Sequence, residues 1–421
     1  MCSSDLLGNG PAGVIAAEMI RQRAPQDEII MIGSEDAPPY SRMAIPYLLM
    51  GNIEESGTYL RKESGHFEKL NIKQLRDRVT SIEVNSKKVF LDSQPKNPIS
   101  FDRLLIATGS TPIQPPILGI DLPGVHSCWT LEDARSISSL AKPGSRVLQM
   151  GAGFIGCIIL EALASQKIDL TVVEMGDRMV PRMMTAAAGG MIKKWVQDKG
   201  VQVFTDTKVL EIKQSESGLT VHLSNHKVIE VDLVVSATGV RPNIDYLASS
   251  DLKIDRGVLV NDRMQTSIPN IYAAGDVAEC IDFSTGHRIV NAIQPNAADQ
   301  ARIAAINMTG GDVQSPGALQ INVLDTMGLI SSSFGLWSGA PGGDYVEVID
   351  QIGFKYLRLE FFKDILVGAT CVGSTEHIGV LRGLIQGKIP LGEWKQLLLD
   401  EPTKLMEAYL AKGQAQSHWM N

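Results

Sequence analysis

The sequence predicts an α/β protein with two similar parallel-sheet domains, one inserted into the other, followed by an α+β domain. Three observations lead to this prediction. A glycine-rich turn occurs twice between a strand and a helix, an apolar strand ending in Thr-Gly closes each copy, and the pattern of elements changes after about residue 314. With 421 residues, 44% of them hydrophobic and 20% charged, the chain is long enough for two or three domains around a large core.

The first glycine-rich turn is the run Gly8-Asn9-Gly10-Pro11-Ala12-Gly13. A helix is predicted from Val14 to about Gln22, then a strand over Ile29–Ile32 and an acidic residue, Glu35. In such a turn the first glycine permits the bend, the second lets a pyrophosphate approach the backbone, and the third lets helix and strand pack closely. The N–H groups at the start of the helix can bind phosphate, and the acid can bind a ribose.

The second copy repeats this order of elements. A strand at Val147–Met150 precedes the run Gly151-Ala152-Gly153-Phe154-Ile155-Gly156, and a helix is predicted through Ala164. The next strand, Leu170–Val173, ends at Glu174. One such glycine pattern is weak evidence, but two copies with the same context make two ordinary turns an improbable explanation. Both domains are therefore predicted to be Rossmann-like and to bind dinucleotides.

Each copy closes with a further apolar strand at the edge of the sheet where ligands bind. The first runs over Leu104–Gly109 and includes Ala107 and Thr108, and the second runs over Leu233–Gly239. A third strand, Ile271–Ala274, ends in Gly275-Asp276, and a helix is predicted from Pro295 to about Asn307.

The last hundred residues predict a separate α+β domain. Strands are expected at 356–361 and 365–371, and helices at about 376–386 and 392–410.

The first residues, Met1-Cys2-Ser3-Ser4-Asp5-Leu6, do not resemble a central parallel strand, which is normally a continuous apolar run. Translated from a GTG start codon, a common sequencing-adapter stretch encodes this hexapeptide. We hypothesise that it replaces the native first residues, which an unbroken genomic sequence across the junction would test.

Composition narrows the class of protein further. The net charge of −8 comes without a concentrated basic patch, so no nucleic-acid partner is expected. No run of about 18 apolar residues and no secretory signal is visible, so no membrane span is expected. The 5 cysteines lie far apart and the 7 histidines have no metal-ligand spacing, which predicts no metal site and a reducing cytoplasmic location.

These motifs resemble those of the pyridine nucleotide-disulfide oxidoreductase superfamily of flavoproteins. Within it, the chain is most similar to the group of rubredoxin reductases, ferredoxin reductases and the flavin subunit of nitrite reductase. The resemblance implies a discontinuous FAD-binding domain of residues 1–112 and 243–314 and an NAD-binding domain of residues 113–242. It also implies a C-terminal α+β domain of residues 315–421 that faces the acceptor or an interface.

The resemblance also assigns cofactor contacts residue by residue. FAD would be held by Gly8, Gly10, Pro11, Ala12, Gly13, Glu35, Arg42, Val79, Ala107, Thr108, Gly109 and Asp276. The nicotinamide dinucleotide would be held by Gly151, Gly153, Phe154, Ile155, Gly156, Glu174 and Gly239. The carboxylate of Glu174 favours NADH over NADPH because it repels a 2′-phosphate, although Arg178 could soften this preference.

The sequence departs from its relatives in two places. Where disulfide reductases carry a reactive cysteine, this chain has Met43 or a neighbour, so disulfide reduction is not expected. The Lys–Glu pair that many ferredoxin reductases place near the flavin is replaced by Tyr47 and Ile158. Tyr47 and Glu161, one turn after Ile158, are the only candidates for an auxiliary role, and a helix-surface carboxylate is an equally good interpretation of Glu161. The flavin is expected to carry the chemistry.

The predicted function is that of an FAD-dependent NAD(P)H:acceptor oxidoreductase that passes electrons to a small redox protein of ferredoxin or rubredoxin type, or to an iron–sulfur partner subunit. The alternatives are an NADH oxidase, a nitrite-reductase-type flavin module and a flavin-bound NADH sensor. The sequence names neither the acceptor nor the oligomeric state, and a homo-oligomer is compatible with it.

Overall fold

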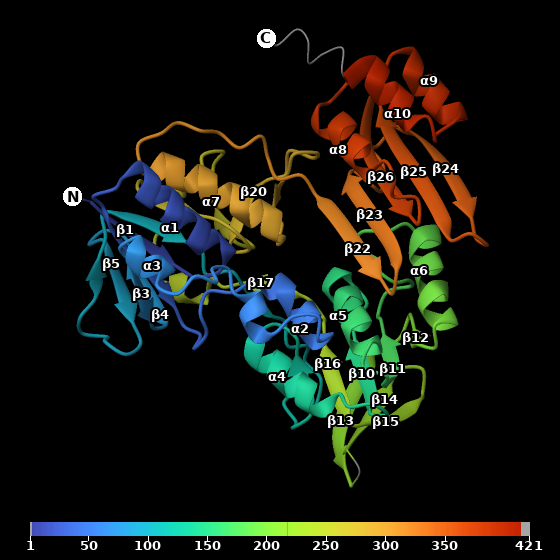
Figure 1. Cartoon of the computed structure of the whole chain (residues 1–421), viewed down its shortest axis with the longest axis horizontal. Helices are drawn as coiled ribbons and strands as arrows, with labels where there is room; N and C mark the ends of the chain where they lie inside the picture. Colours follow the sequence, from blue (N-terminus) through green and yellow to red (C-terminus); the bar gives the residue numbers. More distant parts are fainter. Residues whose placement is uncertain (1, 217, 414–421) are drawn as a thin grey trace. The chain divides into compact units, whose positions relative to one another are not determined.

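The computed structural model describes residues 2–216 and 218–413, so Met1 and residues 414–421 of the predicted C-terminal domain lie outside this description. The chain forms two compact units (Figure 1). Unit 1 comprises Met1–Pro112, Trp129–Leu131 and Val240–Ala318, and unit 2 comprises Ile113–Cys128, Glu132–Gly239 and Leu319–Asn421.

Unit 1 is built on a five-stranded sheet in the order β19-β7-β1-β2-β3, and every neighbouring pair in it is parallel. The strands are β1 (Ser3–Leu7), β2 (Glu28–Gly33), β3 (Ile72–Arg76), β7 (Arg103–Ile106) and β19 (Ile271–Ala273). Because all five strands run the same way, the residues that follow them emerge at one edge of the sheet.

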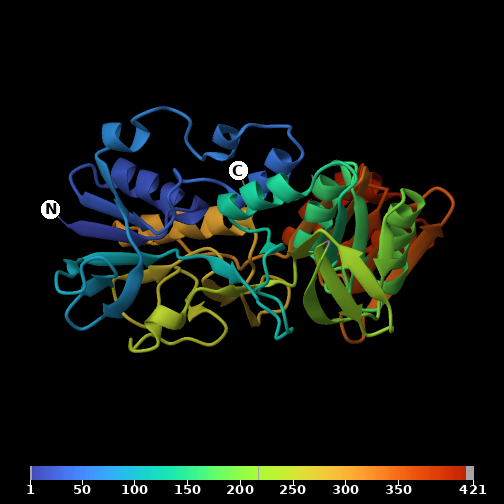
Figure 2. The ribbon, with the colours of Figure 1, turned by 90° about the horizontal axis from the view of Figure 1, so that it is seen from below.

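Two helices of unit 1, α1 (Pro11–Arg23) and α7 (Gln294–Met308), pack against each other, as Figures 1 and 2 both show. Helix α1 begins with Pro11, whose missing N–H and fixed φ suit a first turn. Small residues such as Ala16 and Ala301 are fully buried and allow the close approach. The sheet and these helices form one continuous hydrophobic core.

Smaller elements complete unit 1. They are α2 (Ile45–Leu49), α3 (His66–Lys69), the sheet β4 (Val79–Glu83), β5 (Lys88–Leu91) and β6 (Ile99–Ser100), the pair β8 (Ser110–Pro112) and β17 (Val240–Pro242), and the sheet β18 (Val258–Leu259), β20 (Ala278–Ile281) and β21 (Arg288–Ile289).

Unit 2 contains a second five-stranded parallel sheet in the order β12-β11-β10-β16-β9. Its strands are β9 (Val125–Ser127), β10 (Arg146–Met150), β11 (Asp169–Val173), β12 (Gln202–Phe204) and β16 (Leu233–Ser236). Its helices are α4 (Leu131–Leu140), α5 (Phe154–Ala164) and α6 (Ala186–Asp198), and an antiparallel sheet of β13 (Val209–Ser215), β14 (Gly218–Leu223) and β15 (Val228–Val231) completes it.

The C-terminal part of unit 2 is an antiparallel sheet with helices. The strand order is β22-β23-β26-β25-β24, made of β22 (Ile321–Thr326), β23 (Leu329–Gly335), β24 (Asp344–Asp350), β25 (Lys355–Phe362) and β26 (Ile365–Val372). Helix α8 (Ile378–Gln386) follows. The single helix predicted over 392–410 is wrong: it is divided into α9 (Glu393–Asp400) and α10 (Leu405–Ala408) around Pro402, whose ring prevents a continuous helix.

The first strand, β1, is the central strand of the unit 1 sheet, and this placement buries polar side chains. Ser4 and Asp5 are fully buried, and neither the Ser4 hydroxyl nor the Asp5 carboxyl has a hydrogen-bond partner. The strand therefore forms despite its composition, supported by Leu6 and Leu7 and by pairing with β2 and β7. Within residues 2–216 and 218–413, no helix is long and apolar enough to cross a membrane.

Candidate functional site

The residues predicted to contact FAD gather at the carboxyl edge of the sheet in unit 1. Gly8 directly follows β1, Glu35 follows β2, Val79 comes three residues after β3, Ala107 follows β7, and Asp276 comes three residues after β19. Five separate stretches of sequence are thus brought to one edge of a parallel sheet, which is where α/β folds bind their ligands.

The three glycines of the first turn differ in what surrounds them. Gly8 has φ +119°, and a Cβ there would lie 2.0 Å from the Ala107 carbonyl oxygen. A Cβ at Gly13 would lie 1.9 Å from the Gly8 carbonyl oxygen, whereas a Cβ at Gly10 would meet nothing within 4 Å. The protein itself therefore requires the first and third glycines. The open space at Gly10, beside the N-terminus of α1, fits a pyrophosphate.

The second turn, in unit 2, repeats this arrangement. Gly151 has φ +96°, and a Cβ there would lie 2.5 Å from the Ala237 carbonyl oxygen. A Cβ at Gly156 would lie 2.4 Å from the Gly151 carbonyl oxygen, and one at Gly153 would again meet nothing within 4 Å. The turn leads into the first residues of α5, Phe154 and Ile155, both partly buried. It therefore has room for a second phosphate group.

Arg42 is the centre of a polar cluster beside the first turn. Its Nη2 donates to Glu35 Oε1 at 2.6 Å, and its Nη1 donates to the Trp129 carbonyl oxygen at 2.7 Å. The guanidinium carbon also lies 5.3 Å from the centre of the Trp129 ring. The Tyr40 hydroxyl donates to Glu35 Oε2 at 2.5 Å. Glu35 and Arg42, assigned to FAD separately, are thus joined in one group of charges.

Asp276 is held at the same edge through Ser110. The Ser110 hydroxyl donates to Asp276 Oδ2 at 2.6 Å. Burial raises the pKa of Asp276, while the hydrogen bond from Ser110 and the charge of Arg42 oppose this shift. Next to Ser110, the Thr108 carbonyl oxygen accepts from Asn243 Nδ2 at 2.8 Å, and the Gly109 carbonyl oxygen accepts from the Asn243 N–H at 2.9 Å.

Glu174, at the end of β11, is oriented by two backbone groups. Its Oε2 accepts from the Ala152 N–H at 2.6 Å and its Oε1 from the Gly176 N–H at 2.7 Å. Each carboxylate oxygen can accept a second hydrogen bond, so both remain able to bind a hydroxyl group. Gly239 follows β16 at the same edge with φ +110°, and a Cβ there would meet only Ile113 Cδ1 at 3.7 Å.

The two auxiliary candidates lie in different units. Tyr47, on α2 in unit 1, is 53% exposed. Glu161, on α5 in unit 2, accepts a hydrogen bond from the backbone N–H of Met327 in the β22–β23 turn. Its pKa is raised, first by burial and then by the nearby charge of Asp325. Glu161 therefore contacts the C-terminal sheet of its own unit.

Four of the five cysteines are buried, and burial disfavours the thiolate in each of these four. Burial raises the pKa of Cys128 and of Cys371 to about 12, and it raises the pKa of Cys157 and Cys280 as well. None of the five cysteines forms a disulfide. A thiol relay needs an accessible thiolate, so these four buried cysteines do not fit that role.

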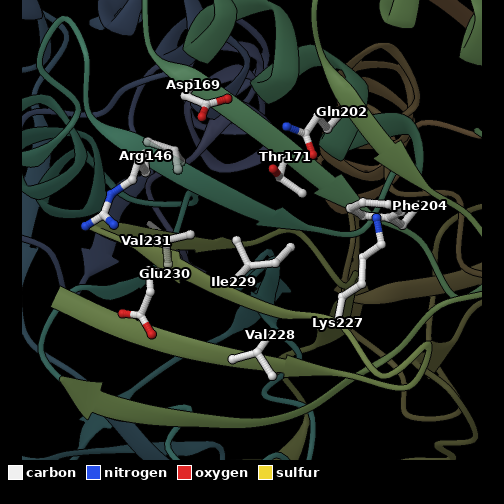
Figure 3. A pocket seen from close by; sticks show the side chains of 11 residues that line it. Arg146, Asp169, Thr171, Gln202, Phe204, Lys227, Val228, Ile229, Glu230 and Val231 are labelled. Carbon is white, nitrogen blue, oxygen red and sulfur yellow. The ribbon is translucent and has the colours of Figure 1, made fainter.

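An open groove of about 310 Å³ lies on the second parallel sheet (Figure 3). It is lined by residues of β10, β11 and β12 on one side and by Val228–Val231 of β15 on the other, and no residue of the glycine turn lines it. Its cations are already engaged, since Arg146 pairs with Asp232 at 2.6 Å and Lys227 lies over the Phe204 ring at 4.4 Å. The groove is separate from the dinucleotide turns.

Sequence reasoning missed the side chains that support the cluster around Arg42. Tyr40 stands in the same Pro-Pro-Tyr-Ser-Arg run as Arg42 and could have been noted there. Trp129, Ser110 and Asn243 belong to no motif, and only the folded chain brings them to the site.

Two glycine turns of the dinucleotide-binding pattern, on two parallel sheets, are typical of one class of protein, the oxidoreductases that bind both FAD and a nicotinamide dinucleotide. Comparison with known families agrees, since the pyridine nucleotide-disulphide oxidoreductase family matches residues 6–301. The chain belongs to this family, and it is an FAD- and pyridine nucleotide-dependent oxidoreductase.

Individual relatives agree with this placement. The epsilon subunit of the NADH-dependent phenylglyoxylate dehydrogenase of Aromatoleum evansii is 29% identical over 94% of each chain. An NADH oxidase of Methanocaldococcus jannaschii is 33% identical over 72% of this chain and 69% of its own. Among solved structures, an NAD-dependent persulfide reductase from A. fulgidus has a TM-score of 0.85 and 28% identity, covering 93% of this chain and 78% of its own.

Proposed function

We propose that this protein is an NADH:acceptor oxidoreductase in which FAD, held by unit 1, receives electrons from NADH, held by unit 2, and passes them to a small redox protein or a partner subunit. The observation that carries the proposal is the pair of glycine turns whose middle glycines, Gly10 and Gly153, both face open space. When bound, a flavin accepts a hydride and can release its electrons singly or in pairs.

The residues assigned to each cofactor have distinct tasks in this proposal. The N–H groups at the starts of α1 and α5, where Pro11, Ala12, Phe154 and Ile155 lie, bind the pyrophosphates. Glu35 and Glu174 bind ribose hydroxyls, and Arg42 neutralises phosphate charge. Val79, Ala107, Thr108, Gly109, Asp276 and Gly239 line the remaining parts of the two sites.

The surroundings of Glu174 favour NADH over NADPH. The carboxylate is fixed by two N–H groups and would meet a 2′-phosphate with like charge. Arg178, the nearby cation, is engaged elsewhere: Nη1 pairs with Asp177 at 2.7 Å, and Nε donates to the Met184 carbonyl oxygen at 2.9 Å. It is therefore poorly placed to offset that repulsion.

Steady-state kinetics with both cofactors test this preference. We expect a higher kcat/KM with NADH, by at least about tenfold, because a single charged hydrogen bond contributes that much to discrimination. Glu174→Gln should raise the KM for NADH and lower the ratio of kcat/KM with NADH to kcat/KM with NADPH. A lower KM for NADPH in the unaltered protein would contradict the assignment.

The relatives support an acceptor that is itself a protein. The similarity to a subunit of an NADH-dependent dehydrogenase extends over nearly the whole of both chains. Four of the five cysteines are buried, which argues against a disulfide substrate, and five free cysteines suit a reducing compartment such as the cytoplasm. An NADH oxidase activity is the second candidate, favoured by the 33% identity to such an enzyme.

The deciding experiment is an anaerobic stopped-flow record of the FAD-loaded protein mixed with NADH. Rapid bleaching of the yellow flavin band is expected. Turnover is then compared with oxygen, nitrite and an iron–sulfur protein as acceptors. A flavin band that NADH does not bleach would refute the proposal, and oxygen as the fastest acceptor would favour the oxidase.

A further inference from the structure

One aromatic side chain contacts the groups that connect the predicted FAD ligands to one another. Trp129 lies between β9 and α4, yet it belongs to unit 1. Its indole Nε1 donates to the Ser110 carbonyl oxygen at 3.0 Å, and its own carbonyl oxygen accepts from Arg42 Nη1 at 2.7 Å. Its ring centre lies 5.3 Å from the guanidinium carbon of Arg42.

These contacts reach both sides of the predicted FAD site. On one side, Arg42 continues to Glu35 through a hydrogen bond of 2.6 Å. On the other side, Ser110 continues to Asp276 through a hydrogen bond of 2.6 Å. Glu35 and Asp276 follow different strands of the sheet, β2 and β19. Trp129 contacts both branches.

We propose that Trp129 is a positioning residue of the FAD site, which holds Arg42 and, through Ser110, Asp276 in the arrangement that the cofactor binds. This inference rests on the proposed function. An arginine side chain loses much rotational freedom when it is fixed, and fixing it before the ligand arrives lowers the cost of binding. The ring restricts the guanidinium by a cation–π contact, and the indole N–H restricts the backbone that carries Ser110.

The alternative is that Trp129 merely fills space. Partial burial is compatible with both roles, but the two roles predict different measurements. A space-filling residue affects the stability of the protein without changing how tightly the folded protein binds FAD. A positioning residue affects FAD affinity, and its effect depends on Arg42.

The experiment measures the Kd of the FAD-free protein for FAD by flavin fluorescence, together with circular dichroism of each variant. Trp129→Leu, which removes the ring and the N–H, should weaken FAD binding by about tenfold, within the range expected for a cation–π contact plus a hydrogen bond. Trp129→Phe keeps a ring and should weaken binding by only about threefold. In the Arg42→Gln background, Trp129→Leu should have much less effect, because its partner is gone.

Trp195→Leu is the matched control. Trp195 is also partly buried, donates its indole N–H to a backbone carbonyl oxygen, that of Met327 at 3.2 Å, and lies 4.5 Å from a cation, Lys199. It belongs to unit 2, so its loss should leave the Kd for FAD unchanged.

The outcomes separate the inference from the function on which it rests. An unchanged Kd in folded Trp129→Phe and Trp129→Leu would overturn the positioning role while leaving the function intact. Equal effects of Trp129→Leu with and without Arg42 would also overturn it. If Trp129→Leu does not fold, Trp129→Phe decides by the same measurement. Failure of the unaltered protein to bind FAD would overturn the proposed function and this inference together.

Discussion

At the scale of single residues, the most costly feature is the buried carboxyl of Asp5. It lies in the central strand of a parallel sheet, fully buried, and neither oxygen has a hydrogen-bond partner. Burial raises its pKa from 3.8 to about 7, and the negative charges of Glu28 and Asp102 add to the shift. Central parallel strands are normally apolar throughout, so this position is one where sequence and fold disagree.

This disagreement predicts a pH-dependent stability. Because the folded state binds the Asp5 proton more tightly than the unfolded chain, stability falls as pH rises from about 4 to about 7 and stays low above it. A shift of this size corresponds to roughly 4 kcal/mol. Asp5→Val should therefore raise the melting temperature strongly at pH 8 and less at pH 5.

Thermal unfolding of both proteins at the two pH values measures this effect. Asp5→Asn serves as the control, because it remains polar but does not titrate, so its melting temperature should depend less on pH than that of the unaltered protein. A constant difference between the unaltered protein and Asp5→Val across this range would show that folding does not raise the pKa of Asp5.

At the scale of the element, the glycines of the second turn differ in whether the fold or the ligand requires them. Gly153→Ala adds a methyl group to open space, whereas Gly156→Ala places it 2.4 Å from the Gly151 carbonyl oxygen. Gly153→Ala should leave the melting temperature nearly unchanged and raise the KM for NADH, because the methyl group occupies the place of the pyrophosphate. Gly156→Ala should lower the melting temperature by itself.

Melting curves and NADH titrations of the two variants test this distinction, with Gly190→Ala as the control. Gly190 lies in α6, and a Cβ there would also meet nothing within 4 Å, so neither stability nor NADH binding should suffer. Unchanged NADH binding in Gly153→Ala would mean that the dinucleotide does not approach this turn.

Helix α5 supports a second prediction, which concerns Glu161. Its carboxyl binds the N–H of Met327 in the β22–β23 turn, and burial and Asp325 both raise its pKa. Glu161→Gln keeps an acceptor for that N–H and removes the charge. The rate at which NADH bleaches the flavin should therefore stay unchanged. A carboxyl with a raised pKa makes the folded protein less stable as the pH rises, and this loss of stability should be smaller in Glu161→Gln. A large drop in the bleaching rate would instead assign Glu161 to the chemistry.

The helices and strands also show which parts of the fold could be predicted from the sequence alone. The start of β16 and the end of α5 were predicted to the residue, because glycine turns and continuous apolar runs are local signals. Pro402 divides the helix predicted over 392–410. A proline is a local signal for the end of a helix, so this division could have been predicted from the sequence. Strand β24 was not predicted because most of its residues are exposed, so it lacks the alternation of a half-buried strand.

The residues of the candidate site also divide into those that the sequence could predict and those that only the folded chain reveals. The glycines, Glu35 and Glu174 stand at fixed spacings in motifs, so the sequence could nominate them. Trp129 comes 87 residues after Arg42, and its role depends on a contact that only the folded chain creates. The same holds for Glu161, whose partner, Met327, lies in a distant β-turn.

At the scale of the whole molecule, the sequence and the structure group the C-terminal sheet differently. The sequence predicts a separate domain from residue 315, and the structure groups residues 319–413 with the second parallel sheet in one compact unit. Trp195 of α6 donates to the Met327 carbonyl oxygen at 3.2 Å and packs against Phe354 with a ring separation of 4.9 Å. The Thr185 hydroxyl lies 2.7 Å from the Tyr356 hydroxyl. These contacts join the C-terminal sheet to α6 and the segment before it, in the same unit as the second glycine turn.

Removal of the C-terminal sheet should therefore damage NADH binding more than FAD binding. A chain that ends at Ala318 exposes the face of α5 that packs on β22, and it leaves Thr185 and Trp195 without these partners. Exposed apolar surface and lost hydrogen bonds both favour local unfolding of unit 2. We expect the shortened protein to bind FAD with nearly unchanged Kd, while NADH bleaches the flavin slowly or not at all. Bleaching at the full rate would show instead that residues 319–421 form an independent domain, as the sequence alone predicts.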